Sequence, residues 1–311
     1  MATVVMLVVL RLTIGWHFLY EGVWKFEHAE FSAEPFLTQA KGPAAPLFYA
    51  MVHDIDGRQR LKIETDPKSG KSSISGKLYL DAWTALDNQV VRKYKLSSQQ
   101  KQLLEKKHKT YAAALDNYLK ENLDDIRAYF GSLDRFEAAE NAGNNGAAHQ
   151  LKRRWDRRME LRKEVGGWLA ELDALDESYR QAVWSDVLNK DQRAMGDLPR
   201  TWTQADLLNY AVKYALTAIG LCLLLGFCTR LAALGGAGFL VSVLLTQPPW
   251  PTIYPPAPEV VGHALLVDKN FVEMIASLLL ATTAVGRWGG LDCFLYHWFG
   301  RRVDAYFEQK I

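Results

Sequence analysis

The sequence predicts an all-α membrane protein, in which a four-transmembrane-helix bundle carries an inserted soluble helical hairpin or coiled-coil domain. Apolar runs lie toward both ends of the 311 residues, and the charged residues concentrate between them. Residues 52–205 hold 27 of the 37 Lys and Arg residues and 24 of the 35 Asp and Glu residues. Apolar residues within this charged block recur at the three- and four-residue spacing of helices. One soluble fold for the whole chain is therefore excluded.

This division predicts three parts. Residues 1–51 form the first transmembrane helix and the start of an outer loop, 52–205 form an extracytoplasmic helical insertion, and 206–311 form transmembrane helices two to four and a cytoplasmic tail. The net charge of +2 argues against a nucleic-acid partner, because phosphate binding usually needs a basic patch or stripe.

Four apolar runs are the candidate membrane segments. They extend over about residues 4–26, 207–227, 231–246 and 271–285. The first lacks a basic n-region and a small-residue cleavage site, which favours a retained helix over a cleaved signal peptide. The fourth is short for a hydrocarbon core of about 30 Å, which needs about 20 helical residues.

Basic residues beside these runs predict the orientation in the membrane. Arg230 lies between the second and third runs, and Arg287, Arg301 and Arg302 follow the fourth. The positive-inside bias then places both termini in the cytoplasm. The expected location is a bacterial inner (cytoplasmic) membrane, with residues of about 27–206 in the periplasm.

The inserted block is expected to be mainly helical. Helical periodicity runs over about residues 97–123 and again over 147–183, and these two stretches would pair as an antiparallel hairpin. The sequence NAGNNG at 141–146 would break the helix between them. Residues 52–80 are richer in β-branched and turn residues and predict a small strand pair.

Short motifs in both apolar parts carry a family resemblance. Residues 11–26 (RLTIGWHFLYEGVWKF) resemble the opening helix of the DoxX/DoxD family, and 220–233 (GLCLLLGFCTRLAA) resemble its second helix and following turn. Residues 269–273 (KNFVE) and 286–292 (GRWGGLD) are similar to its fourth helix and end. The motifs occur in the family's order, and the resemblance extends over about 110 of the 311 residues.

The resemblance implies a four-helix membrane bundle, and some members of the family are the small subunit of thiosulfate:quinone oxidoreductase. Two departures stand out. The helical insertion is far longer than the usual first loop, and Leu216 occupies the position where many members carry an acidic residue.

Polar residues in and beside the apolar runs are the candidate ligand-binding site. A charged side chain at the centre of a membrane helix costs about 2.5–3.5 kcal/mol, so it needs a partner, water or an interface. The candidates would line a periplasm-side cavity: His17, Glu21, Lys25, His263, Lys269 and Glu273. Alternatively they pair structurally, with Arg11 and Lys25 reaching opposite headgroup layers and Glu21 and Glu273 neutralising their neighbours.

Two functions therefore remain open. The first is a membrane subunit of a quinone-linked oxidoreductase, in which a histidine beside a carboxylate exchanges a proton with a quinone. The second is a non-catalytic scaffold whose periplasmic hairpin binds another envelope protein. For either function, the expected partners are the lipid bilayer and a second membrane or periplasmic subunit. With three cysteines and no CxxC or CxxCH motif, we expect no covalent cofactor and no metal, and a quinone is the candidate ligand.

Overall fold

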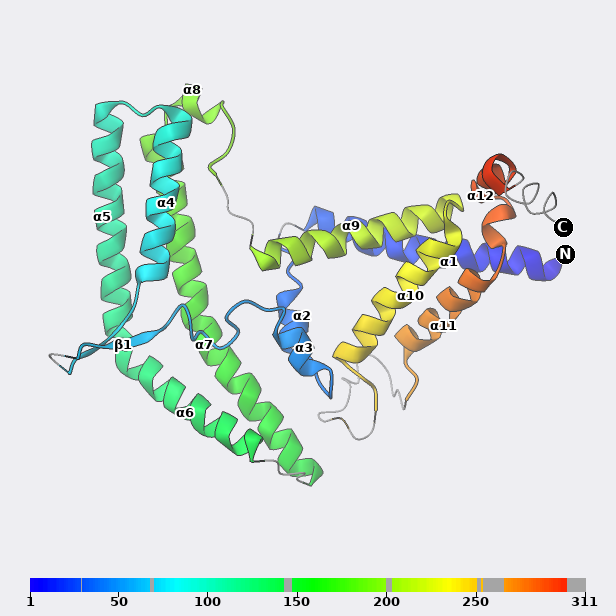
Figure 1. Cartoon of the computed structure of the whole chain (residues 1–311), viewed down its shortest axis with the longest axis horizontal. Helices are drawn as coiled ribbons and strands as arrows, with labels where there is room; N and C mark the ends of the chain where they lie inside the picture. Colours follow the sequence, from blue (N-terminus) through cyan, green and yellow to red (C-terminus); the bar gives the residue numbers. More distant parts are fainter. Residues whose placement is uncertain are drawn as a thin grey trace, which may run out of the picture. The chain divides into compact units, whose positions relative to one another are not determined.

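The chain is mainly helical and divides into two compact units (Figure 1). This computed structural model describes residues 1–28, 30–67, 70–142, 147–199, 203–250, 253 and 266–300. One unit joins Met1–His53 to Trp202–Ile311, and the other is Asp54–Thr201. We call them the bundle unit and the inserted unit.

Three helices of the bundle unit are long and apolar enough to cross a membrane. They are α1 (Ala2–Glu27), α9 (Gln204–Leu225) and α10 (Thr229–Thr246). The fourth expected segment forms α11 (Lys269–Thr282), whose 14 residues extend about 21 Å, less than the hydrocarbon core. A short 3₁₀ turn (Val285–Arg287), α12 (Asp292–Leu295) and a final π-helical turn (Tyr296–Gly300) follow.

Helices α1 and α9 lie side by side at close range because glycines face the contact (Figure 1). A Cβ added to Gly220 would lie 2.3 Å from the backbone nitrogen of Leu19, and one added to Gly22 would lie 2.3 Å from Thr217 Oγ1. Such small residues let membrane helices approach until their backbones touch. Leu216 is buried in the core of the same unit.

Two short helices follow α1 in the chain and belong to the same unit. They are α2 (Glu34–Thr38) and α3 (Ala45–Tyr49), which bury Leu37 and Phe48 in a small apolar cluster. The backbone N–H of Lys41 donates to the carbonyl oxygen of Thr246 at 2.8 Å, which ties this segment to the end of α10.

The inserted unit consists mainly of helices around one apolar core. Its elements are β1 (Ile63–Thr65), β2 (Ser72–Ile74), α4 (Lys77–Tyr94), α5 (Ser98–Glu121), α6 (Leu123–Asn141), α7 (Ala148–Ala182), a π-helical turn (Val183–Val187) and α8 (Lys190–Arg193). The strands pair antiparallel with Ile63 opposite Ile74, so the strand pair predicted within residues 52–80 is confirmed.

The prediction of a two-helix hairpin is wrong in one respect. The first helix ends before Asn122, so that α5 and α6 are separate helices that meet at an angle. Both pack against α7 (Figure 1). The Asn122 side chain donates to the carbonyl oxygen of Tyr118, a local bond that competes with continued helix. Asp124 and Asp125 then occupy the first turn of α6, where negative charges stabilise a helix by interacting with the positive end of its dipole.

A polar network crosses the core of the inserted unit. The indole N–H of Trp83, which is fully buried, donates to Asp176 at 2.6 Å. The Tyr179 hydroxyl donates to Asp87 at 2.5 Å, and the His108 ring nitrogen lies 2.7 Å from the same carboxylate. Burial raises the pKa of Asp87, opposed by its bonds to Tyr179 and His108. The network therefore connects α4, α5 and α7 through side chains as well as through apolar packing.

Candidate functional site

A polar contact joins α1 to α11 in the bundle unit. The Nδ1 atom of His17 on α1 lies 2.7 Å from Oε1 of Glu273 on α11. The two side chains differ in exposure, 57% for His17 and 17% for Glu273. The Glu273 carboxyl group is thus largely buried, while the His17 imidazole is exposed at the surface of the bundle unit.

A second pair lies further along α1. Lys25 Nζ is 2.6 Å from Glu21 Oε2, in the favourable order of an ion pair one helical turn apart. The lysine ammonium also lies 5.4 Å from the centre of the Phe31 ring. The side chain of Lys25 is 13% exposed, so the acid and the ring together compensate a cation that is mostly removed from solvent.

The structure thus resolves four of the six predicted site residues into two pairs. His17 with Glu273 spans two helices, whereas Glu21 with Lys25 stays within one. Lys269 is exposed in the first turn of α11, one turn before Glu273. His263 lies outside the described residues.

Lys213 is a cation near this group that the sequence analysis did not select. Its ammonium on α9 lies 5.7 Å from the Phe31 ring centre and 5.9 Å from that of Phe26. Phe31 therefore contacts both Lys25 and Lys213. The available signal was the presence of a lysine in an otherwise apolar segment, which requires compensation.

Arg11 lies in the interior of the bundle unit, whereas the structural-pairing hypothesis expected its side chain to extend outward to the headgroups. It is 1% exposed, and its guanidinium donates to the carbonyl oxygens of Val285 and Gly289, each at 3.3 Å. The space exists because Gly226 and Gly290 lack side chains; a Cβ on either would lie 2.3 or 2.6 Å from Nη1 of Arg11. Arg11 thus joins α1 to the segment after α11.

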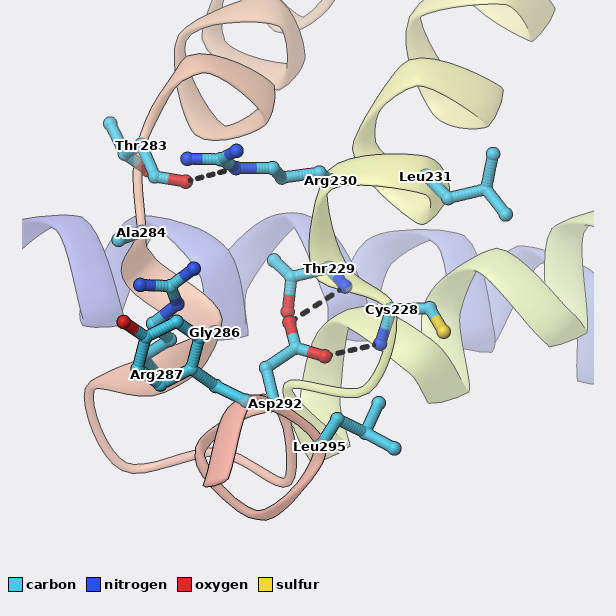
Figure 2. Close-up of a pocket in the computed structure, with 11 residues that line it drawn as sticks. Cys228, Thr229, Arg230, Leu231, Thr283, Ala284, Gly286, Arg287, Asp292 and Leu295 are labelled. Atoms are coloured by element: carbon cyan, nitrogen blue, oxygen red, sulfur yellow. Dashed lines mark hydrogen bonds between the residues drawn. The ribbon is translucent and has the colours of Figure 1, made fainter. Parts of the chain in front are cut away.

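Asp292 holds the start of α10. Its two carboxylate oxygens accept hydrogen bonds from the backbone amides of Cys228 at 2.6 Å and Thr229 at 2.9 Å, as Figure 2 shows. The residue is a helix cap supplied from a distant part of the chain. Electrostatic attraction between Arg11 and Asp292 adds to the connection.

A cavity of about 320 Å³ opens beside this cap (Figure 2). Its walls come from the start of α10, the segment after α11, α12, and the first residue of the π-helical turn that follows α12. The lining residues are Cys228, Thr229, Arg230, Leu231, Thr283, Ala284, Gly286, Arg287, Asp292, Leu295 and Tyr296.

Comparisons with protein-family models, curated proteins and solved structures find no match to this chain. Within the described part, no group of three or more His, Cys, Asp or Glu side chains is placed to hold a metal ion. The three cysteines are free thiols. The function must therefore be argued from the site itself.

Proposed function

We propose that this chain is a DoxX/DoxD-type integral membrane protein that binds a quinone at His17 and Glu273, as the membrane subunit of a quinone-linked redox system. The observation that carries the proposal is the 2.7 Å contact between these two side chains, with the imidazole exposed at the surface of the bundle unit. The expected setting is a bacterial inner membrane, with both termini cytoplasmic and the inserted unit in the periplasm.

The surface of the bundle unit supports insertion into lipid. Large apolar side chains are exposed on α1, α9, α10 and α11, which a water-soluble monomer rarely tolerates. Among them are Val9, Leu12, Leu221, Leu225, Leu234, Val241, Val272, Ile275 and Leu279. In a bilayer these side chains contact acyl chains, so their exposure carries no cost.

The position of His17 along α1 suits a lipid-soluble ligand. The residue lies about 9 Å along the helix axis from Arg11 and about 12 Å from Lys25, so it is between the two cationic levels. A quinone dissolved in the acyl-chain region can reach an exposed imidazole at this level without crossing the headgroups. The imidazole offers a hydrogen bond to a quinone carbonyl oxygen, and Glu273 holds the ring.

The chemistry proposed for the pair is proton exchange. Reduction of a quinone to a quinol takes up two electrons and two protons. The electrons would come from a partner protein that carries its own redox centre. His17 would deliver one of the two protons to the nearer quinone oxygen and would regain a proton from water through Glu273, while the other quinone oxygen would take the second proton from water. An imidazole suits this step because it can both donate and accept a proton.

Quinone retention tests this proposal. The full chain is purified in mild detergent, and its quinone is extracted and quantified by chromatography. We expect retention in the wild type and at least a tenfold loss in His17→Phe and Glu273→Gln. Thr13→Val is the matched control, since Thr13 is exposed one turn earlier and its hydroxyl donates to the carbonyl oxygen of Val9 on the same helix. Absence of quinone in every preparation, or equal retention in all variants, would overturn the proposal.

The inserted unit supports a second candidate, a scaffold that binds another envelope protein. This unit has a hydrophobic core of its own and a surface with many exposed ion pairs, such as Lys109 with Glu105 and Lys120 with Asp116. Cross-linking in cells followed by mass spectrometry should identify a partner on the intact chain that is lost when residues 60–195 are deleted. Unchanged partners after the deletion would reject the scaffold role.

A further inference from the structure

Two arginines line the cavity in Figure 2 without a carboxylate partner among the described residues. Arg230 stands in the first turn of α10, and its Nε donates to the carbonyl oxygen of Thr283 at 3.2 Å. Arg287 lies in the 3₁₀ turn after α11, with its guanidinium 3.7 Å from the centre of the Tyr296 ring. One nitrogen of Arg230 and one face of Arg287 are thus occupied, while both residues remain exposed.

The carboxylate in the same cavity does not neutralise them. Both oxygens of Asp292 accept backbone amides, and its charge is attracted to Arg11. The hydroxyl of Thr229, which is 1% exposed and also lines the cavity, has no hydrogen-bond partner in the described part of the chain. The cavity therefore combines an excess of positive charge with an unused buried donor.

Apolar side chains form part of the remaining cavity wall. Leu231, Ala284 and Leu295 line it, and Leu231 is 72% exposed. Phe294 next to Leu295 is also 72% exposed. A ligand that satisfies all of these features has an anionic head for the arginines and hydrocarbon for the leucines.

We propose that this cavity binds the phosphate group of an anionic phospholipid, with Arg230 and Arg287 as the two cationic contacts and the Thr229 hydroxyl as a further donor. The phosphate takes hydrogen bonds from the guanidinium groups, and the acyl chains pass over Leu231 and Leu295. The inference rests on the membrane insertion proposed above but is independent of quinone binding. It assigns a role to the basic residues beyond that of orientation.

Native mass spectrometry of the full chain in detergent tests the lipid site. Phosphatidylglycerol and phosphatidylcholine with identical acyl chains are offered in competition. We expect phosphatidylglycerol to be retained preferentially. Each of Arg230→Gln and Arg287→Gln should weaken the preference about fivefold, and the double variant should abolish it.

Three controls separate the site from general electrostatics. Arg230→Lys keeps the charge and should retain most of the preference, whereas Arg127→Gln removes the same charge from an exposed position of the inserted unit and should change nothing. Leu295→Glu leaves both arginines in place and should still abolish the preference, because it adds a carboxylate to the wall. This last variant keeps the test valid if the arginine variants fold poorly.

Several outcomes would overturn the inference. These are equal retention of the two lipids, an unchanged preference in the double variant or in Leu295→Glu, and an equal loss in Arg127→Gln. Displacement of the lipid by millimolar inorganic phosphate would instead assign the cavity to the free anion. Quinone content of the double arginine variant should equal that of the wild type, so failure here is distinguishable from failure of the proposed function.

Discussion

Arg11 in the first helix donates a hydrogen bond to the carbonyl oxygen of Val285, 274 residues later in the chain. Both residues are fully buried or nearly so, and the same guanidinium reaches Gly289. A buried guanidinium group can donate to these carbonyl oxygens only where the surrounding helices and turns hold the donor and the acceptors close together. This contact therefore joins α1 to the segment following α11 and positions the wall of the cavity beside Asp292.

Removal of Arg11 should destabilise the bundle unit. Arg11→Met removes the charge that attracts Asp292 and the guanidinium donor to the carbonyl oxygens of Val285 and Gly289. The expected loss is about 1.5–3 kcal/mol of folding free energy, the range for hydrogen bonds that involve a charged group. Thermal unfolding in detergent measures the effect. Arg11→Lys keeps the charge and should lose less; equal stability of Arg11→Met and wild type would contradict the assignment.

Gly220 should not tolerate a side chain. A Cβ there would overlap backbone atoms of Leu19, so Gly220→Ala must separate α1 from α9. Overpacking of this kind costs about 1–3 kcal/mol or more. Gly238→Ala is the matched control, because a Cβ at Gly238 meets nothing within 4 Å. Thermal unfolding of both variants in the same detergent checks this, and similar midpoints would refute the close contact.

The Asp292 cap predicts a graded series. Asp292→Ala removes both acceptors from the amides of Cys228 and Thr229, which should cost about 0.5–2 kcal/mol. Asp292→Asn keeps one acceptor oxygen and should lose less. Hydrogen exchange at the first turn of α10 should increase in the same order. If Asp292→Ala exchanges as slowly as the wild type, these bonds do not hold the helix start.

Buried tyrosines predict alkaline instability of the inserted unit. Desolvation raises the pKa of Tyr79, Tyr129 and Tyr179 in the folded state, while an unfolded tyrosine ionises near pH 10. Above that pH the unfolded chain has released protons that the folded chain retains. Stability should therefore be unaffected below about pH 9 and fall above pH 10, by about 1.4 kcal/mol per pH unit for each tyrosine.

Circular dichroism and tyrosinate absorbance against pH measure this effect on the full chain. Tyr179→Phe removes one of the three titrating tyrosine hydroxyls, so the stability of this variant should fall less steeply above pH 10 than that of the wild type. The same variant should be less stable at neutral pH, because the Asp87 carboxylate loses a donor. An alkaline slope equal to that of the wild type would show that Tyr179 ionises in the folded state.

The candidate site divides according to the range of its contacts. Glu21 and Lys25 are one turn apart on a helix, so their 2.6 Å contact follows from spacing alone. His17 and Glu273 were both selected from sequence, but their direct contact depends on how α1 packs against α11. Lys213 was missed because its relation to Phe31 involves a third segment.

Sequence alone determined the elements whose causes are local. Three of the four apolar segments, the strand pair near Ile63 and the helical nature of the inserted block all depend on neighbours a few residues away. The tertiary structure decided where the charged side chains lie. From the sequence, Arg11 could be expected to extend to the lipid headgroups, but glycines of distant segments make space for it in the interior. The physical reason is that a buried charge is stabilised only by groups placed around it in three dimensions, and helix packing, not sequence spacing, supplies those groups.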